Sequence, residues 1–229
     1  MRRIYAHAAA RRRRALQDAA AGGGGVAFDL SIHSGLAGKF ELSETDSADD
    51  TASTTGGGGN NGIVAFATAM TAGKWYVEVD CLAFAASPTL NQIGVSGDTI
   101  TAGPHTVATD SDDAIGLRGE GRIVTGNSIK ATDLALDIET GTRFLMAFDA
   151  DLRTFWVGEI RSAPTVDWCV NDPTSGGYPT GGLAVSGNTA YYFGISTSTA
   201  ESGDPFTIQA VQFADITGTP PDGFTYLGQ

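Results

Sequence analysis

Residues 73–80 read Gly-Lys-Trp-Tyr-Val-Glu-Val-Asp, and the side chains of this stretch alternate in character. Successive side chains of a β-strand point to opposite faces, so this alternation predicts a strand with one buried face. The apolar face carries Trp75, Val77, Val79 and Cys81, and the other face carries Tyr76, Glu78 and Asp80. We expect the second face to be exposed to solvent, with Glu78 near a strand edge.

A second segment, residues 143–158, predicts a β-hairpin. It reads Arg-Phe-Leu-Met-Ala-Phe-Asp-Ala-Asp-Leu-Arg-Thr-Phe-Trp-Val-Gly, with aromatic and β-branched residues on both sides of an Asp-rich turn. Such arms around a polar turn are typical of paired antiparallel strands. We expect Trp75 and Phe155 to face inward from separate strands.

The rest of the chain after residue 26 continues this pattern of short strands between polar turns. The composition of 229 residues, with 31 glycines, 17% charged and 41% hydrophobic residues, fits one large all-β domain with many tight turns. Residues 44–62 are expected to form a long polar loop. The predicted strands cover residues 26–33, 40–43, 63–69, 74–82, 92–96, 114–117, 122–125, 134–138, 144–148, 154–159, 189–196 and 206–213.

Charge is distributed unevenly along the chain. From residue 15 onward there are 8 basic and 26 acidic residues, a net charge of −18, whereas the N-terminus is basic. Residues 4–21 are rich in strong helix formers and are followed by four glycines, which predicts a basic helical arm (residues 1–25) ahead of the sandwich (residues 26–229). The arginines of this arm, expected to anchor the chain to a partner, are Arg2, Arg3, Arg11, Arg12, Arg13 and Arg14.

Two further features bear on the environment of the chain. No run of about 18 apolar residues occurs, so we expect no insertion into a membrane. Cys81 and Cys169 are expected to be reduced thiols, although a bridge across the sandwich is the alternative.

Six segments, taken in their order along the chain, resemble the motifs of a SPRY (B30.2-like) domain. The resemblance spans about residues 26–227 and implies a concanavalin-like sandwich of two curved antiparallel sheets, which binds partners through loops and carries out no chemistry. The Pro-Pro-Asp-Gly-Phe ending at residues 220–224 looks most similar to SPRY-type domains of bacteriophage virion proteins. Where that family often ends the second hairpin strand in Asn-Gly, this chain has Val157-Gly158. The segments that carry the resemblance are residues 73–80, 93–96, 115–117, 144–158, 192–194 and 219–227.

An enzymatic alternative arises from the same strand. Some glucanases of the concanavalin-like class carry Glu-x-Asp-x-Glu, because carboxylates on one face about 5 Å apart can act as nucleophile and acid/base. Here Glu78 and Asp80 match two positions and Leu82 replaces the third carboxylate, so no catalytic residue and no cofactor is predicted. Five aspartates elsewhere in the chain could bind calcium. Turn formation is their favoured role, so no metal is predicted. These aspartates are Asp110, Asp112, Asp113, Asp149 and Asp151.

Aromatic residues near predicted turns are candidates for ligand binding, since rings on loops can stack on sugars or anchor a protein interface. They are Trp168, Tyr178, Tyr191 and the neighbouring Tyr192. The alternative is that some of them cap the open ends of the sandwich.

These observations lead to a functional hypothesis. The chain is expected to be a non-enzymatic structural protein located in a bacteriophage virion, as a capsid decoration or a head or tail fibre subunit. The arm would bind capsid or tail proteins. Nucleic acid is disfavoured by the acidic body, and a homo-oligomer is compatible with this role. The alternative is an adhesin domain that recognises a host surface protein or glycan.

Overall fold

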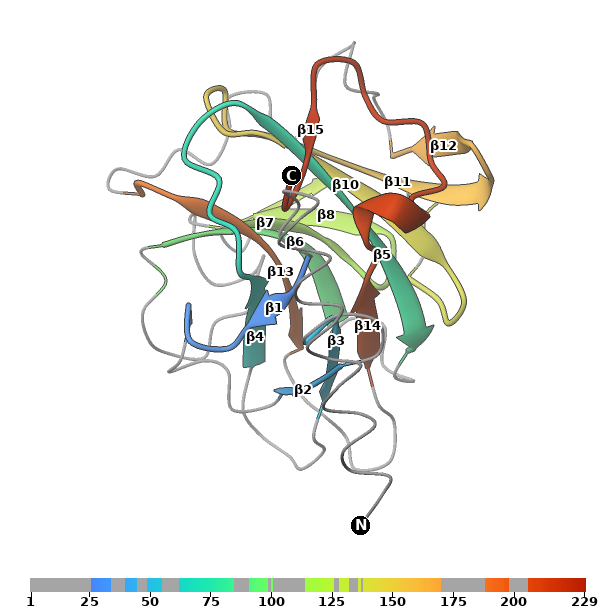
Figure 1. The fold of residues 1–229 in the computed structure, drawn as a ribbon, viewed down its shortest axis with the longest axis horizontal. Coiled ribbons are helices and arrows are strands. Elements are labelled where there is room, and N and C mark those ends of the chain that lie inside the picture. The colour runs from blue at the N-terminus through green and yellow to red at the C-terminus, as the bar shows by residue number, and fades with distance from the viewer. Residues whose placement is uncertain are drawn as a thin grey trace, which may run out of the picture.

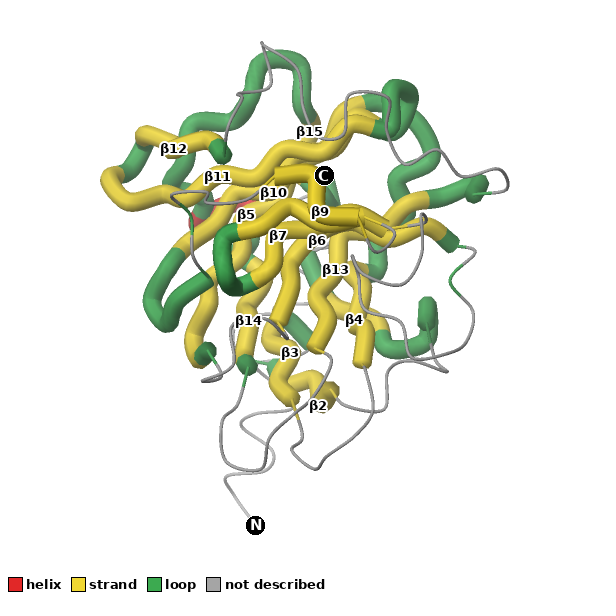
Figure 2. The backbone as a smooth tube through the Cα atoms, turned by 180° about the vertical axis from the view of Figure 1, so that it is seen from behind, coloured by secondary structure: helices red, strands yellow, loops and turns green. Residues whose placement is uncertain are grey.

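The computed structural model of the chain is a sandwich of two antiparallel sheets (Figure 1). Seen from behind, strands again make up most of the described backbone (Figure 2). The only helix among the described residues is the short 3-10 helix η2 (Phe213–Asp215). The structure describes residues 26–33, 40–44, 49–54, 62–84, 91–98, 100, 114–125, 128–131, 136, 138–169, 188–197 and 206–229.

The first sheet, sheet A, has seven strands in the order β1-β4-β13-β6-β7-β8-β9. All neighbouring strands in it are antiparallel. Its strands are β1 (Phe28–Asp29), β4 (Gly62–Phe66), β6 (Asn91–Gly97), β7 (Ala114–Arg118), β8 (Arg122–Thr125), β9 (Ser128–Ala131) and β13 (Tyr191–Thr197).

The second sheet, sheet B, has eight strands, seven of which follow the order β12-β11-β10-β5-β14-β3-β2. The eighth, β15 (Thr225–Tyr226), pairs in parallel with the start of β5. The other strands are β2 (Phe40–Ser43), β3 (Thr51–Thr54), β5 (Lys74–Ala83), β10 (Arg143–Asp149), β11 (Thr154–Ser162), β12 (Thr165–Trp168) and β14 (Thr207–Ala210).

The predicted hairpin is confirmed as β10 and β11, which pair in an unbroken register from Phe144–Glu159 to Asp149–Thr154. Its turn is held by Asp149, whose Oδ1 accepts the backbone N–H groups of Asp151 and Leu152 at 3.0 and 2.9 Å. Arg153 closes the turn with a left-handed φ of 55°, a conformation that costs a non-glycine residue free energy. The Asp-rich sequence therefore serves the turn itself.

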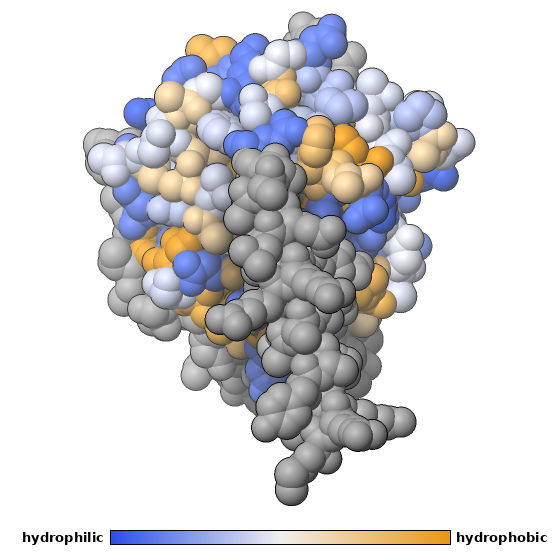
Figure 3. All heavy atoms as spheres, in the orientation of Figure 1, coloured by the Kyte–Doolittle hydropathy of each residue, from blue (hydrophilic) through white to orange (hydrophobic). Residues whose placement is uncertain are grey.

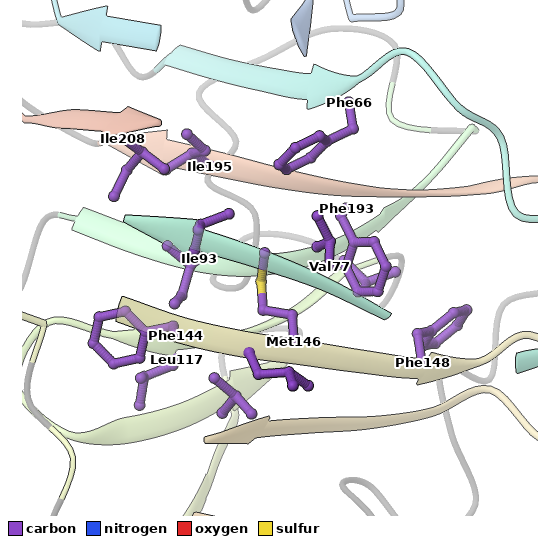
Figure 4. Packing of buried hydrophobic residues seen from close by; sticks show 14 of the residues in the cluster. Phe66, Val77, Ile93, Leu117, Phe144, Met146, Phe148, Phe193, Ile195 and Ile208 are labelled. Atoms are coloured by element: carbon purple, nitrogen blue, oxygen red, sulfur yellow. The ribbon is translucent and has the colours of Figure 1, made fainter. Parts of the chain in front are cut away.

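The core lies between the two sheets. Strands β5, β10 and β14 of sheet B and strands β4, β6, β7 and β13 of sheet A contribute the large apolar side chains to it (Figure 4). Ten of these fully buried side chains are labelled in Figure 4: Phe66, Val77, Ile93, Leu117, Phe144, Met146, Phe148, Phe193, Ile195 and Ile208. Phe155 also points into this core, as predicted, whereas Trp75 is only half-buried.

The opposite, outer face of sheet B is covered by residues 211–227, which we call the C-terminal segment. The segment leaves β14, forms η2, reaches the β11–β12 hairpin and returns as β15 beside β5 (Figure 1). Its Phe224 ring packs edge-on against Trp156 at 5.7 Å, and its Tyr226 ring packs against Tyr76 at 4.9 Å. Both faces of sheet B are therefore buried over its central strands.

Some sequence-based expectations about strands are wrong. The expected polar loop at residues 44–62 contains β3, in which Ala52 is fully buried. The expected strand at residues 134–138 is absent at its described positions, Leu136 and Ile138, and sheet A uses β9 instead. Strands β12 and β15 were not expected, and the first expected strand, residues 26–33, shortens to β1.

Both cysteines are free thiols, in agreement with the favoured prediction. Burial raises the pKa of Cys81 and of Cys169 to about 12. The expected helix at residues 4–21 lies outside the described residues, so the division into an arm and a sandwich stays a prediction. Among the residues that are described, no helix is both long and apolar enough to cross a bilayer.

Candidate functional site

The two carboxylates of β5 lie on the outer face of sheet B. The prediction that Glu78 is a solvent-facing edge residue is wrong, because β5 runs between β10 and β14 and Glu78 is 0% exposed. Glu78 is buried because the C-terminal segment crosses this face of the sheet directly over it. Strand alternation alone predicted the correct face but not its cover.

Glu78 holds the C-terminal segment through two consecutive backbone N–H groups. Gly218 N donates to Oε1 at 2.7 Å, and Thr217 N donates to Oε2 at 3.0 Å. A Cβ atom on residue 218 would lie 2.7 Å from Cδ1 of Ile160 and 3.0 Å from Oε1 of Glu78, so a larger residue would force the side chain of Ile160 to shift. Hydrogen bonds to an ionised acceptor are stronger than neutral ones, which makes this contact a firm attachment.

Arg143 of β10 joins the two carboxylates. Its Nε and Nη2 atoms donate to the two oxygens of Asp80 at 2.6 and 2.7 Å, and its Nη1 lies 3.4 Å from Oε2 of Glu78. The same Nη1 donates to the carbonyl oxygen of Asp215 and to the hydroxyl of Thr217, both at 3.1 Å. The hydrogen bond with Asp80 is the main reason why the pKa of Arg143 is raised.

This arrangement leaves neither carboxylate available as a glycosidase acid or nucleophile. Glu78 is buried against backbone donors, and Asp80 accepts a two-pronged hydrogen bond from Arg143. The third position on the same face is Leu82, whose side chain is 44% exposed. The residues that resemble a catalytic motif thus attach the C-terminal segment to sheet B.

The candidate aromatic residues lie in different environments. Trp168 is at the end of the edge strand β12, half-buried and opposite Gly158 of β11. Tyr191 lies in β13, within the predicted strand at residues 189–196. It is 4% exposed and packs against Phe148 at 5.2 Å, so this ring belongs to the core. Tyr178 lies outside the described residues. Trp168 and Tyr192 of β13 are therefore the described candidates that combine an aromatic ring with partial exposure, and the ring of Tyr192 lies edge-on to His33 at 6.1 Å.

The candidate calcium ligands of the hairpin turn act within the protein. Asp149 accepts backbone N–H groups of its own turn, and Oδ2 of Asp151 accepts the N–H of Gly73 at 3.1 Å. These bonds support the predicted turn-forming role. Asp110, Asp112 and Asp113 lie outside the described residues. Elsewhere in the described ranges, no three His, Cys, Asp or Glu side chains gather closely enough to hold a metal ion.

His33 forms a buried polar contact at the outer side of sheet A. Its Nδ1 lies 3.1 Å from the carbonyl oxygen of Ile100 and its Nε2 lies 3.1 Å from Oγ of Ser96. The ring is 4% exposed, and this burial lowers the pKa of His33. The histidine joins the turn after β1 to β6, a role that the sequence did not indicate.

The point at which the arm would join the sandwich is well defined. The side chain of Gln212 accepts the N–H of Val26 at 2.9 Å and donates to its carbonyl oxygen at 2.8 Å. Directly after Gln212, η2 presents the side chain of Phe213, which is 48% exposed. The six arginines of the arm lie outside the described residues. The chain therefore enters the sandwich beside an exposed aromatic ring.

No known family model matches the sequence, and no curated protein matches it. Its architecture places the chain in the class of two-sheet β-sandwiches with a concanavalin-like fold. Solved structures narrow this class further. The chain matches the SPRY domain of human HERC1 with a TM-score of 0.53 and 14% identity, over 81% of this chain and 98% of that domain.

A second SPRY structure gives the same picture. The TRIM65 PSpry domain matches with a TM-score of 0.52 and 14% identity, over 82% of this chain and 92% of that one. Stonustoxin matches with a TM-score of 0.53 and 14% identity, over 82% of this chain but 27% of the toxin chain. The chain therefore has the SPRY fold, and the resemblance found in the sequence is confirmed at the level of fold.

Proposed function

We propose that the chain is a non-enzymatic binding module that serves as a structural subunit of a bacteriophage virion, as a capsid decoration or a head or tail fibre subunit. Its SPRY fold is one that often binds proteins. The observation that supports the non-enzymatic part of the proposal is the state of the two candidate carboxylates, which are occupied by the C-terminal segment and by Arg143. The virion assignment rests on the Pro-Pro-Asp-Gly-Phe sequence at residues 220–224.

The proposed anchor is the basic arm. Residues 1–25 carry six arginines and one aspartate, a net charge of +5, whereas residues 26–229 carry 8 basic and 25 acidic residues, a net charge of −17. A basic segment joined to an acidic body favours a partner that is itself acidic and contacts the arm. Capsid or tail proteins with an acidic surface fit this requirement.

Virus particles purified from the source of this sequence provide the test. Immunogold labelling and mass spectrometry should detect the chain on particles, and deletion of residues 1–21 should remove it from them. Because salt reduces the screening length from about 10 Å at 0.1 M to about 3 Å at 1 M, occupancy should fall in strong salt. Particles that keep the truncated chain at parental occupancy would show that the arm is not the anchor.

A second candidate function is recognition of a host protein or glycan, and the partly exposed ring of Trp168 favours it. The ring lies on the edge strand of sheet B, beside the exposed side chain of Asp167. A glycan array and a host-cell binding assay would test this role. A specific signal that disappears in Trp168→Ala, with an unchanged melting temperature, would support it, and no binding to any host surface would leave the structural role.

A further inference from the structure

The ring of His33 connects the turn after β1 with Ile100 and with strand β6. Its Nδ1 lies 3.1 Å from the carbonyl oxygen of Ile100, and its Nε2 lies 3.1 Å from Oγ of Ser96. A carbonyl oxygen can only accept a hydrogen bond, so Nδ1 carries the proton of the neutral ring and Nε2 is an acceptor. The hydroxyl of Ser96 therefore donates to Nε2, and this hydrogen bond must reverse its direction when the ring gains a second proton.

Both partners in this contact are shielded from water. His33 is 4% exposed and Ser96 is 0% exposed. Within the described part of the chain, the hydroxyl of Ser96 has no second hydrogen-bond partner, so the reversal leaves its hydrogen without an acceptor. The order of hydroxyl, imidazole and orienting acceptor resembles that of a catalytic nucleophile and its base, but a fully buried hydroxyl cannot meet a substrate. The contact is therefore structural, and it favours the neutral ring.

The histidine fixes more than its own turn. The side chain of Ile100 packs with Ile63 of β4 and Ala114 of β7 in a small apolar cluster, separate from the core between the sheets. Ala114 is the cross-strand partner of Ser96, so the cluster and the ring contact share one face of sheet A. In the closed chain, hydrophobic residues form separate areas among hydrophilic ones on the face drawn in Figure 3. Release of Ile100 would uncover Ile63 and Ala114 as additional apolar surface.

The charged and titratable groups around the ring come from three elements. The carboxylate of Asp98, which follows β6, favours the protonated ring, and so does the hydrogen bond with the carbonyl oxygen. Asp98 is itself held by the N–H and the hydroxyl of Thr189, at 3.1 and 2.6 Å. Tyr192 of β13 lies edge-on to the imidazole at 6.1 Å. The pKa of Tyr192 is raised by burial and then by the charges of Asp98 and of Asp29 in β1. Burial of His33 outweighs the groups that favour its charged form, so its pKa lies below the ordinary value.

We propose that His33 is an acid-sensitive latch. Its neutral ring holds the turn after β1 and Ile100 on sheet A, and the gain of a proton at Nε2 releases both. The proton comes from the solvent and binds the lone pair of Nε2, so no other reactant is required. This inference goes beyond the proposed function, because it concerns the response of the folded chain to acid and holds whether or not the chain is found on virus particles.

The expected pH dependence follows from the two states of the latch. Release brings the ring back into water, where its pKa returns to about 6.5. Acid favours the open state, because the open ring binds the proton more tightly than the closed one. The open fraction should be constant above about pH 7.5, rise as the pH falls through 6.5 and level off below the pKa of the closed ring. The total increase equals the ratio of the acid dissociation constants of the closed and the open ring.

NMR of the histidine ring in the full chain tests the state of the latch. Because the chain has three histidines, the double variant His7→Gln, His105→Gln leaves the ring of His33 as the single signal. Proton–nitrogen correlation at pH 8 should show the proton on Nδ1. Ser96→Ala should raise the pKa of this ring, because the neutral form loses its donor. Asp98→Asn should lower it, because the charged form loses a favourable charge.

Amide hydrogen exchange tests the release itself. After correction for the intrinsic rate, exchange of residues 30–33 and of Ile100 should accelerate from pH 8 to pH 5 by the factor that the closed and open pKa values give. The amides of the β10–β11 hairpin should not change. His33→Gln is the matched control, since its side-chain amide can donate to Ile100 and accept from Ser96 at any pH, so exchange in this variant should not depend on pH. Melting temperatures at pH 8 show that each variant is folded.

Three results would overturn the proposal. One is a ring proton on Nε2 instead of Nδ1 at pH 8. The second is a pKa of His33 that Ser96→Ala and Asp98→Asn shift in the same direction. The third is exchange of residues 30–33 and of Ile100 that stays constant between pH 8 and pH 5, or that accelerates equally in His33→Gln.

Discussion

The inner and outer faces of sheet B are both buried, but by different means. The inner face meets a whole second sheet and consists of apolar side chains such as Val77, Met146 and Phe155. Within the described residues, the outer face meets the C-terminal segment, which combines the rings of Phe224 and Tyr226 with charge-assisted hydrogen bonds to Glu78. A sheet face can thus be buried by packing alone or by packing plus a few strong polar contacts. Substitutions on the two faces should therefore lower the stability by different amounts.

The inner face should show the largest effect of a single substitution. Phe155→Ala removes a fully buried ring and leaves a cavity between the sheets, for which we expect a loss of about 3–5 kcal/mol in unfolding free energy. Urea denaturation followed by tryptophan fluorescence measures it. Trp75→Ala is the comparison on β5, and its loss should be smaller because that ring is only half-buried. Equal losses would contradict the assigned packing.

The outer face should show the next largest effect. Glu78→Gln keeps the shape but replaces one accepting oxygen by an NH2 group, so a buried N–H of Thr217 or Gly218 loses its partner. We expect a loss of about 2–3 kcal/mol, in the range for an unsatisfied buried group that had paired with a charge. Hydrogen exchange of the amides of Thr217 and Gly218 should rise at the same time.

The neighbouring pair of Glu159 and Arg161 provides a control for this substitution. Arg161 is exposed, and its ion pair with Glu159 joins two positions of the same strand, β11. Glu159→Gln should change the urea midpoint little, because an ion pair with an exposed arginine contributes little. If Glu78→Gln behaved in the same way, the outer face would be closed by its aromatic rings alone.

Sheet A offers a third, smaller effect that depends on pH. Burial lowers the pKa of His33 below its ordinary value of 6.5, and the hydrogen bond with the carbonyl oxygen of Ile100 and the charge of Asp98 oppose this only partly. The unfolded chain therefore binds a proton more readily than the folded one. Stability should therefore be full above pH 6.5 and decrease as the pH falls below it. Melting temperatures between pH 8 and pH 5 measure this, and the decrease should be smaller in His33→Gln. An identical decrease in that variant would assign it to other groups.

The smallest effect concerns the two thiols, which lie in sheet B and at its edge. Because burial raises the pKa of Cys81 and Cys169 to about 12, neither should react with a thiol reagent in the folded chain at neutral pH. Both should react after denaturation without a reductant. Failure to react after denaturation would indicate a disulfide instead.

The sequence predicted those strands whose own residues show a clear apolar pattern. The alternation from Trp75 to Cys81 identified β5 and its inner face. The aromatic and β-branched residues on both sides of Asp149 identified the β10–β11 hairpin. Strand β3 was missed because Thr51-Ala-Ser-Thr54 has no large apolar side chain to mark it. Strand β15 is two residues long and exists only through its pairing with β5.

The candidate site was harder to predict, because its state depends on contacts between distant residues. Glu78 and Gly218 are 140 positions apart, and no local pattern relates them. The Glu-x-Asp spacing correctly placed two carboxylates on one face, but only the position of the C-terminal segment shows that they are occupied. Tyr191 was a candidate for ligand binding because it lies beside a predicted turn, at the start of the predicted strand 189–196, whereas β13 turns its ring into the core.

The pairing of β15 with the start of β5 has a consequence for the synthesis of the chain. Tyr76 is complete early in translation, but its cover arrives about 150 residues later with Tyr226. Until Phe224 and Tyr226 have left the ribosome, the rings of Trp156 and Tyr76 remain uncovered on the outer face of the nascent sheet. The half-made chain should therefore depend on holdase chaperones, and ribosome-bound intermediates that stop before residue 211 should be captured by them more strongly than those that extend past residue 227.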